Sequence, residues 1–135
     1  MQDWTDSPAP SCEDIAQLAQ AARAALPGPI ALAAEGVVIR VVDLADDDTV
    51  RQLDLQSPFE LTGLYDGIPL TEKSVMDQPE RPDIIWLYRR PILDEWAERG
   101  AVPLGALVAH IVVHEFAHHF GWSDSEIARI DAWWE

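Results

Sequence analysis

The sequence predicts an α+β domain in which a small mixed sheet packs against helices and a buried helix lies at the centre. Helical periodicity alternates with short runs of β-branched and aromatic residues, which is typical of this class. The segment that follows Pro103 is apolar on nearly every side, as expected of a helix enclosed by other elements. A chain of 135 residues with 48% hydrophobic residues suits one domain with its own core.

The N-terminal part predicts a tail followed by a helix. Residues 1–10 contain two prolines and are expected to form a flexible tail, so the domain should span 11–135. Ser11 is the expected N-cap of the first helix, because acidic residues follow it in the first turn and an apolar stripe continues beyond them. The sequence Pro-Gly-Pro at 27–29 ends this helix.

The next stretch predicts a turn, a strand and a second acidic turn. An Ala-rich turn over 30–34 leads into a β-branched run over 37–42, which we interpret as a buried strand. The consecutive aspartates at 46–48 resemble a metal cluster in composition only. Their side chains point in different directions, so we expect a solvated turn that starts a short helix or loop ending near Gln56.

The middle of the chain predicts a hairpin and another strand. Residues 59–65 alternate between apolar and polar positions, and Asp-Gly at 66–67 is a hairpin turn signal. The second arm, 68–70, contains a proline and should be an edge strand. The polar segment 71–81 is the expected mobile loop, and 83–88 is a second apolar strand.

Three helices are expected in the C-terminal part. Pro91 should open a helix over 92–99, and Gly100 should end it. The central helix begins at Pro103. Its apolar residues are Leu104, Leu107, Val108, Ile111, Val112, Val113, Phe116, Ala117 and Phe120. Ser123 should cap a last helix, because a glutamate follows three residues later as in a capping box.

The end of the central helix carries a pattern of metal-ligand residues. His114 and His118 are one turn apart, so their imidazoles project from one face of the helix and can hold one cation. Catalytic zinc sites use three protein ligands and leave the fourth position to water. Gly121 can end the helix in a left-handed conformation, and the reversed chain can bring Asp124 back as the third ligand.

Other polar side chains of this helix have different expected roles. Glu115 is not needed as a ligand and can act as the general base that accepts a proton from water. His119 points about 100° away from its neighbour, so it is either structural or a group at the rim of the site. His110 lies one turn before His114 and is a packed neighbour of the site, or a spare ligand if Asp124 fits poorly.

The run from Val113 to Asp124, with the pattern His-Glu-x-x-His-x-x-Gly-x-x-Asp, resembles the signature of small bacterial minimal zincin-like metallopeptidases. Two upstream stretches, 63–74 and 82–91, strengthen the resemblance, which covers roughly residues 11–131. The resemblance implies a zincin-like fold and a Zn²⁺ ion, with other divalent transition metals as alternatives. Its implied site residues are the metal ligands His114, His118 and Asp124 and the catalytic residue Glu115.

The resulting hypothesis is a zinc metallopeptidase that hydrolyses peptide bonds, with Glu115 as general base. An extended substrate is expected to add to an edge strand, either 68–70 or 84–88. Tyr65, Tyr88 and His119 are the candidates for contacting the oxyanion.

Two other classes of function remain open. One is a metal-binding or catalytically silent interaction module that docks a basic protein partner. The other is a non-haem iron oxygenase, which also uses two histidines and a carboxylate but usually carries them on strands. The metzincin class is excluded, because no methionine follows the motif and Met76 lies upstream of it.

Composition limits the partners. The 9 basic and 24 acidic residues give a net charge of −15, which argues against nucleic acid and anionic membranes and favours a basic peptide or protein. The single cysteine, Cys12, excludes an internal disulfide and suits a reducing compartment, although a thiol near a helix start can have a lowered pKa. With no signal sequence and no long apolar span, we expect a cytoplasmic protein. The sequence sets no oligomeric state.

Overall fold

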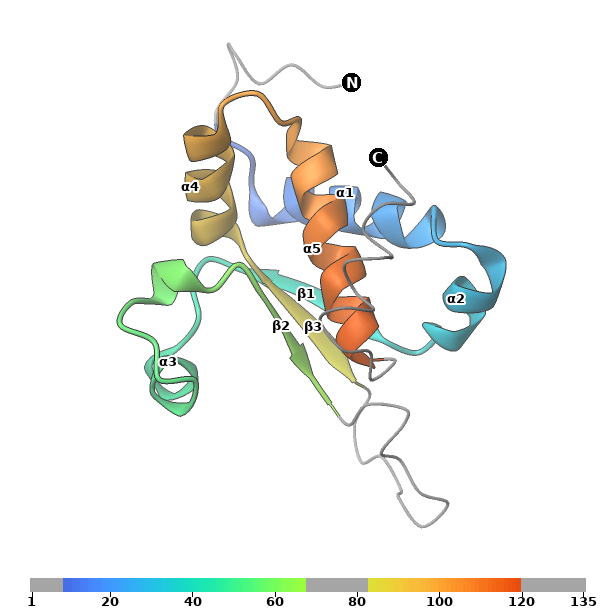
Figure 1. The fold of residues 1–135 in the computed structure, drawn as a ribbon, viewed down its shortest axis with the longest axis horizontal. Coiled ribbons are helices and arrows are strands. Elements are labelled where there is room, and N and C mark those ends of the chain that lie inside the picture. Colours follow the sequence, from blue (N-terminus) through green and yellow to red (C-terminus); the bar gives the residue numbers. More distant parts are fainter. Residues whose placement is uncertain (1–8, 68–82, 120–135) are drawn as a thin grey trace.

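A three-stranded mixed sheet lies at the centre of the computed structural model, which describes residues 9–67 and 83–119 (Figure 1). The strands are β1 (Val38–Val42), β2 (Gly63–Asp66) and β3 (Ile84–Tyr88), in the order β1-β3-β2. β3 runs parallel to β1 and antiparallel to β2. The predicted α+β class with a small mixed sheet is confirmed.

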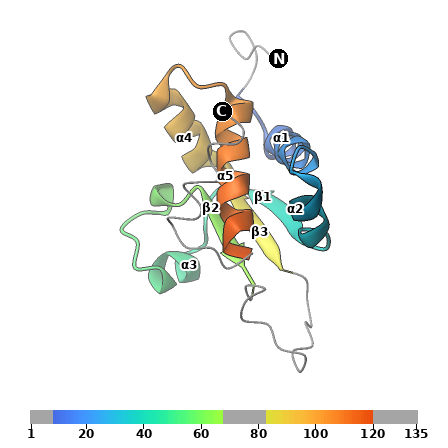
Figure 2. The ribbon, with the colours of Figure 1, turned by 45° about the vertical axis from the view of Figure 1, so that its right-hand side comes forward.

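Five α-helices and one 3₁₀ helix surround the sheet in the described part of the chain. Figure 2 shows α1 and α5 side by side over the sheet, with α4 next to α5 and α3 set apart from them. The bounds are α1 (Cys12–Ala24), α2 (Gly28–Ala33), α3 (Asp47–Gln52), η1 (Pro58–Glu60), α4 (Arg89–Arg99) and α5 (Leu104–His119).

Alternation of side chains along β3 divides the sheet into two faces. Ile85 and Leu87 are fully buried and belong to the core under α1 and α5. Trp86, between them, points to the opposite face, because successive side chains of a strand alternate. Register then places Ile39 and Val41 of β1 on the core face, where both pack against the core.

α5 is the buried central helix that the apolar pattern predicts. Its apolar side chains contact α1, β2, β3 and α4. Burial on several sides stabilises the helix by roughly 25 cal/mol for each Å² of apolar surface removed from water, and it also encloses the polar residues at the C-terminal end. The buried residues are Leu104, Leu107, Val108, Ile111, Val112, Val113, Glu115, Phe116, Ala117 and His119.

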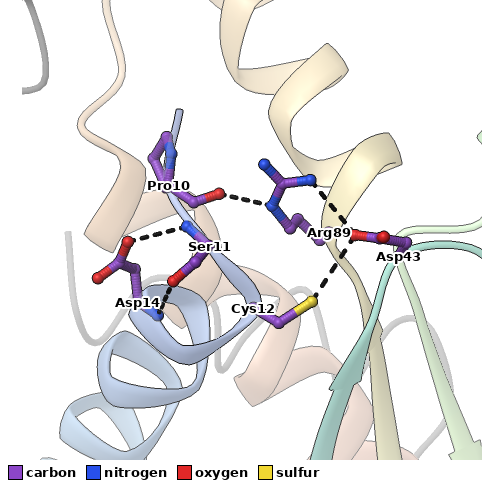
Figure 3. A network of polar contacts seen from close by, with 6 residues as sticks. All are labelled: Pro10, Ser11, Cys12, Asp14, Asp43 and Arg89. Carbon is purple, nitrogen blue, oxygen red and sulfur yellow. Dashed lines mark hydrogen bonds and ion pairs between the residues drawn. The ribbon is translucent and has the colours of Figure 1, made fainter. Parts of the chain in front are cut away.

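The start of α1 is fixed by a polar network (Figure 3). Ser11 is the N-cap and forms a capping box with Asp14, which confirms the predicted helix start. Arg89 donates to the carbonyl of Pro10 and to Asp43, which joins α1, the end of β1 and the start of α4. Pro10 is buried, and residues 1–8 of the predicted tail lie outside the described residues.

Cys12 belongs to the same network and shows no sign of an activated thiol. Its sulfur donates to Asp43, 3.7 Å away. Partial burial and the Asp43 charge raise the thiol pKa, and the guanidinium of Arg89 lowers it less. The position of Cys12 at the start of α1 therefore does not lower the pKa of its thiol.

Two predictions for the first half of the chain are wrong. The segment 30–34 is not a turn, because α2 covers Gly28–Ala33; its proline occupies the first turn of the helix, where a missing N–H costs nothing. β1 is half-buried rather than buried, because it is an edge strand of the sheet. The aspartates at 46–48 do start a short helix, with Asp46 as the N-cap of α3.

The predicted starts of the strand that contains β2 and of the helix α4 are also wrong. Residues 58–60 form a 3₁₀ helix instead of the start of a strand, because Ser57 and Glu60 make a capping box. α4 begins at Arg89, two residues before the proline that was expected to open it; the first turn needs no backbone N–H donor, so Pro91 fits there. Gly100 ends α4 with φ of 76°, as predicted.

Several predictions lie outside the described residues. These are the hairpin arm 68–70, the loop 71–81 and the last helix that Ser123 should cap. Within the part of the chain that the structure describes, no helix is long and apolar enough to cross a membrane.

Candidate metal centre and its surroundings

The last two turns of α5 bring together His114, Glu115 and His118, which we call the metal group. Potential ligand atoms of all three side chains lie within 4.8 Å of one another. The two histidine rings are half-buried, with centroids 4.9 Å apart, and their Nε2 atoms are separated by 3.2 Å. The spacing of one helical turn therefore brings the two imidazoles together as predicted.

The distance between the two nitrogens fits a shared metal ion. Two nitrogens that bind zinc at about 2.0–2.1 Å with tetrahedral angles lie about 3.3 Å apart, and the observed Nε2 separation between His114 and His118 is 3.2 Å. Without a metal, the same contact is a hydrogen bond in which one ring donates. The predicted third ligand, Asp124, and the glycine expected to turn the chain, Gly121, lie outside the described residues.

Glu115 is buried beside the histidine pair, with only 8% of its surface exposed. Burial raises the pKa of its carboxyl group to about 7, although a hydrogen bond from the backbone N–H of Tyr65 lowers it in part. A carboxyl group that titrates near neutral pH can accept and release a proton, as a general base requires. The catalytic role expected of Glu115 stays a prediction.

Gly63 of β2 allows this close approach of α5 to the sheet. A Cβ atom at position 63 would lie 2.8 Å from Cγ2 of Ile111 and 3.3 Å from Cγ of Glu115. Sequence reasoning did not single out Gly63 as a site residue. An isolated glycine within a strand pattern is a signal of close backbone approach, and it was available in the sequence.

His119 turns away from the metal group and joins a buried polar network. Its Nδ1 lies 3.0 Å from the carboxylate of Asp83, just before β3. The hydroxyl of Tyr65 donates to the same carboxylate at 2.8 Å and lies 3.4 Å from the His119 ring nitrogen. The side chains of His119 and Asp83 are only 5% and 9% exposed. These contacts agree with the structural alternative for His119.

His110 lies at a cavity beside the metal group. The cavity has a volume of about 230 Å³ and opens between α4 and α5. The ring of His110 lies 6.5 Å from that of His114, centroid to centroid, and α4 adds an ion pair between Glu95 and Arg99. The cavity is lined by Thr62, Glu95, Arg99, His110, Ile111, His114 and Glu115.

The expected substrate strand 84–88 and the two tyrosine candidates for the oxyanion do not lie as the sequence predicts. Strand 84–88 is β3, the middle of the three described strands, so the expectation that it is an edge strand is wrong. Its continuous apolar run does not indicate which strands lie beside it. Tyr88 is buried and lines a cavity that also contains Trp86, on the face of the sheet opposite α5. The hydroxyl of Tyr65 is bound to Asp83, as described above.

Comparison with known families agrees with this site. A family model described as zincin-like metallopeptidase matches residues 34–134, which covers β1 through the metal group and beyond. No curated protein matches the chain.

Proposed function

The chain belongs to the zincin-like metallopeptidase family, and we propose that it is a zinc-dependent peptidase that hydrolyses peptide bonds in a peptide or protein. The observation that carries this proposal is the convergence of His114, Glu115 and His118 within 4.8 Å. Two imidazoles and a buried carboxyl group at that spacing provide a place for a cation and a base beside it.

His114 and His118 would hold the metal through their Nε2 atoms, and Asp124 is the proposed third ligand. When bound, zinc supplies a Lewis acid that polarises a carbonyl group and lowers the pKa of water. The donor set of two imidazoles and a carboxylate also accepts other divalent transition metals.

Glu115 would act as the general base. Its carboxylate accepts a proton from the attacking water and then passes the proton to the nitrogen of the leaving amine. The backbone N–H of Tyr65 donates to this carboxylate and so holds it in one orientation. In the metal-free protein, burial raises the pKa of this carboxyl group to about 7.

Among the described strands β2 lies at one edge of the sheet, and we propose that an extended substrate lies along this outer edge. The carbonyl of Thr62 accepts a hydrogen bond from Tyr88 of β3. Backbone groups alternate in an antiparallel pair, so those of the next residue, Gly63, face away from β3 and toward the outer edge. Because Gly63 lies against Glu115, a strand added at this edge would pass beside the proposed base.

The test is hydrolysis of an unbiased peptide mixture by the full chain supplied with zinc, with zinc content measured on each variant. Glu115→Gln should retain zinc and lose hydrolysis, because the amide cannot accept the proton. Glu35→Gln makes the same change at an exposed position and should keep activity. A Glu115→Gln variant as active as wild type would rule out the proposed base.

The same experiment separates the other two classes of function. A docking module would hold its partner without cleaving any peptide, with or without Glu115. An oxygenase would require iron and oxygen, and its ligands usually lie on strands, whereas His114 and His118 lie on a helix.

A further inference from the structure

A second cavity lies on the face of the sheet opposite α5. It has a volume of about 640 Å³, is open to solvent, and is lined by residues of α3, of the segment after β1 and of the three strands. Pockets for ligands of moderate size typically span about 300–1,000 Å³. The residues that line it are Val42, Leu44, Asp46, Thr49, Gln52, Leu53, Leu64, Tyr65, Asp66, Trp86 and Tyr88.

The sheet separates this cavity from the metal group. Leu64 pairs with Trp86, and Asp66 pairs with Ile84, so these side chains share one face. Ile85 and Leu87, which alternate with them on β3, pack in the core under α5. A ligand in the second cavity would therefore contact neither His114 nor His118.

The cavity combines apolar walls with two carboxylates. Aliphatic and aromatic residues form most of its lining, and no lysine, arginine or histidine is among the described residues that line it. Each carboxylate accepts a hydrogen bond, and Asp46 is exposed to solvent. Asp46 accepts from the backbone N–H of Thr49 at 2.8 Å, and Asp66 accepts from Nε1 of Trp86 at 3.4 Å.

The carboxylates beside the cavity also act on the hydroxyl of Tyr88. Burial is the main cause that raises its pKa to about 12, and the charges of Asp46 and Asp66 are the next causes. The whole chain adds to this potential, since its net charge is −15. An anionic ligand would be disfavoured here.

We propose that this cavity docks an arginine or lysine side chain from a basic segment of a protein partner. The apolar walls would cover the aliphatic stem of such a side chain, and the carboxylates of Asp46 and Asp66 would bind its charged head. The Trp86 ring offers a face for a cation, which favours arginine over lysine because a guanidinium also stacks on aromatic rings. This docking site does not require hydrolysis at the metal group.

The test is a calorimetric titration of the full chain with a blocked glycine peptide that contains two arginines. Asp46→Asn and Asp66→Asn remove one charge each and keep an oxygen that can accept the existing hydrogen bond, so α3 retains its cap. Each should weaken binding about tenfold, because a charge-assisted hydrogen bond is lost. Asp47→Asn makes the same charge change at an exposed residue outside the cavity and should weaken binding less than about twofold.

Four comparisons decide the result. A peptide with glutamine in place of arginine should not bind, and His118→Ala should bind the arginine peptide as wild type does. The proposal is overturned if Asp47→Asn weakens binding as much as Asp46→Asn, because net charge alone would then account for it. Loss of binding in His118→Ala, equal binding of spermidine, or no binding of the arginine peptide would overturn it as well.

Discussion

Gly63 of β2 and Glu115 of α5 are in such close contact that a Cβ atom on Gly63 would lie 3.3 Å from Cγ of Glu115. The same Cβ would be only 2.8 Å from Cγ2 of Ile111, closer than carbon atoms pack. β2 and the proposed base can therefore lie this close because residue 63 has no side chain.

Replacement of Gly63 by alanine should destabilise the protein. The added methyl group forces α5 or β2 to move, and overpacking of this kind costs about 1–3 kcal/mol in the free energy of unfolding. Urea denaturation measures this cost. Gly105→Ala, within α5, is the matched control, because the added Cβ would make only ordinary contact with Leu18 of α1, at 3.5 Å. That variant should be neutral or more stable, since alanine favours a helix. Equal stability of Gly63→Ala and wild type would refute the close contact.

Burial of Glu115 predicts a pH dependence of stability in the metal-free protein. The pKa of its carboxyl group is about 7 in the folded protein, against 4.5 for a glutamate fully exposed to water. Below about pH 4.5 both the folded and the unfolded state are protonated, and above about pH 7 both are ionised. Between these values the folded state holds a proton that the unfolded state has lost, so stability falls as pH rises. The loss is about 3 kcal/mol over the window.

Glu115→Gln isolates this contribution, because every other titrating group is the same in both proteins. The free energy of unfolding of wild type minus that of the variant should decrease between about pH 4.5 and pH 7. Chelator-treated protein and denaturation at several pH values provide the measurement. A difference that stays constant over this range would mean that Glu115 titrates normally. A difference that rises would mean that its pKa is lowered instead.

The contact between Tyr65 and Asp83 should be visible in a double-mutant cycle. Tyr65→Phe removes a hydroxyl that donates to a carboxylate with 9% exposure, so it should cost about 1–3 kcal/mol of stability. In an Asp83→Ala background the same substitution should cost less, because the accepting carboxylate is already absent. Thermal or urea unfolding of the four proteins gives the coupling energy. Equal costs in the two backgrounds would contradict the contact.

The helix that carries the metal group could be predicted because its signals are local. The apolar pattern of α5 and the spacing of His114 and His118 depend on residues within a few turns. Local signals also predicted the cap at Ser11 and the helix end at Gly100. The missed 3₁₀ helix had such a signal in Ser57-Pro-Phe-Glu60, where the capping box outweighs the strand-like alternation.

The surroundings of the metal group could not be predicted because they depend on pairing between distant segments. Asp83 and His119 are 36 residues apart in sequence, and nothing in either neighbourhood indicates the other. The position of β3 between β1 and β2 likewise follows from the fold as a whole. An apolar run such as 84–88 is compatible with several positions in a sheet, which is why the edge assignment failed.

His114 and His118 are proposed to hold one metal ion between them, and the zinc content of the protein tests this most directly. Elemental analysis after dialysis against trace zinc should give about one zinc per chain for wild type. His118→Ala should lose the metal, and Asp124→Ala should lose it if Asp124 is the third ligand. His110→Ala, one turn before His114, is the control and should keep it. Absence of zinc in wild type, or zinc retained by His118→Ala, would contradict the account.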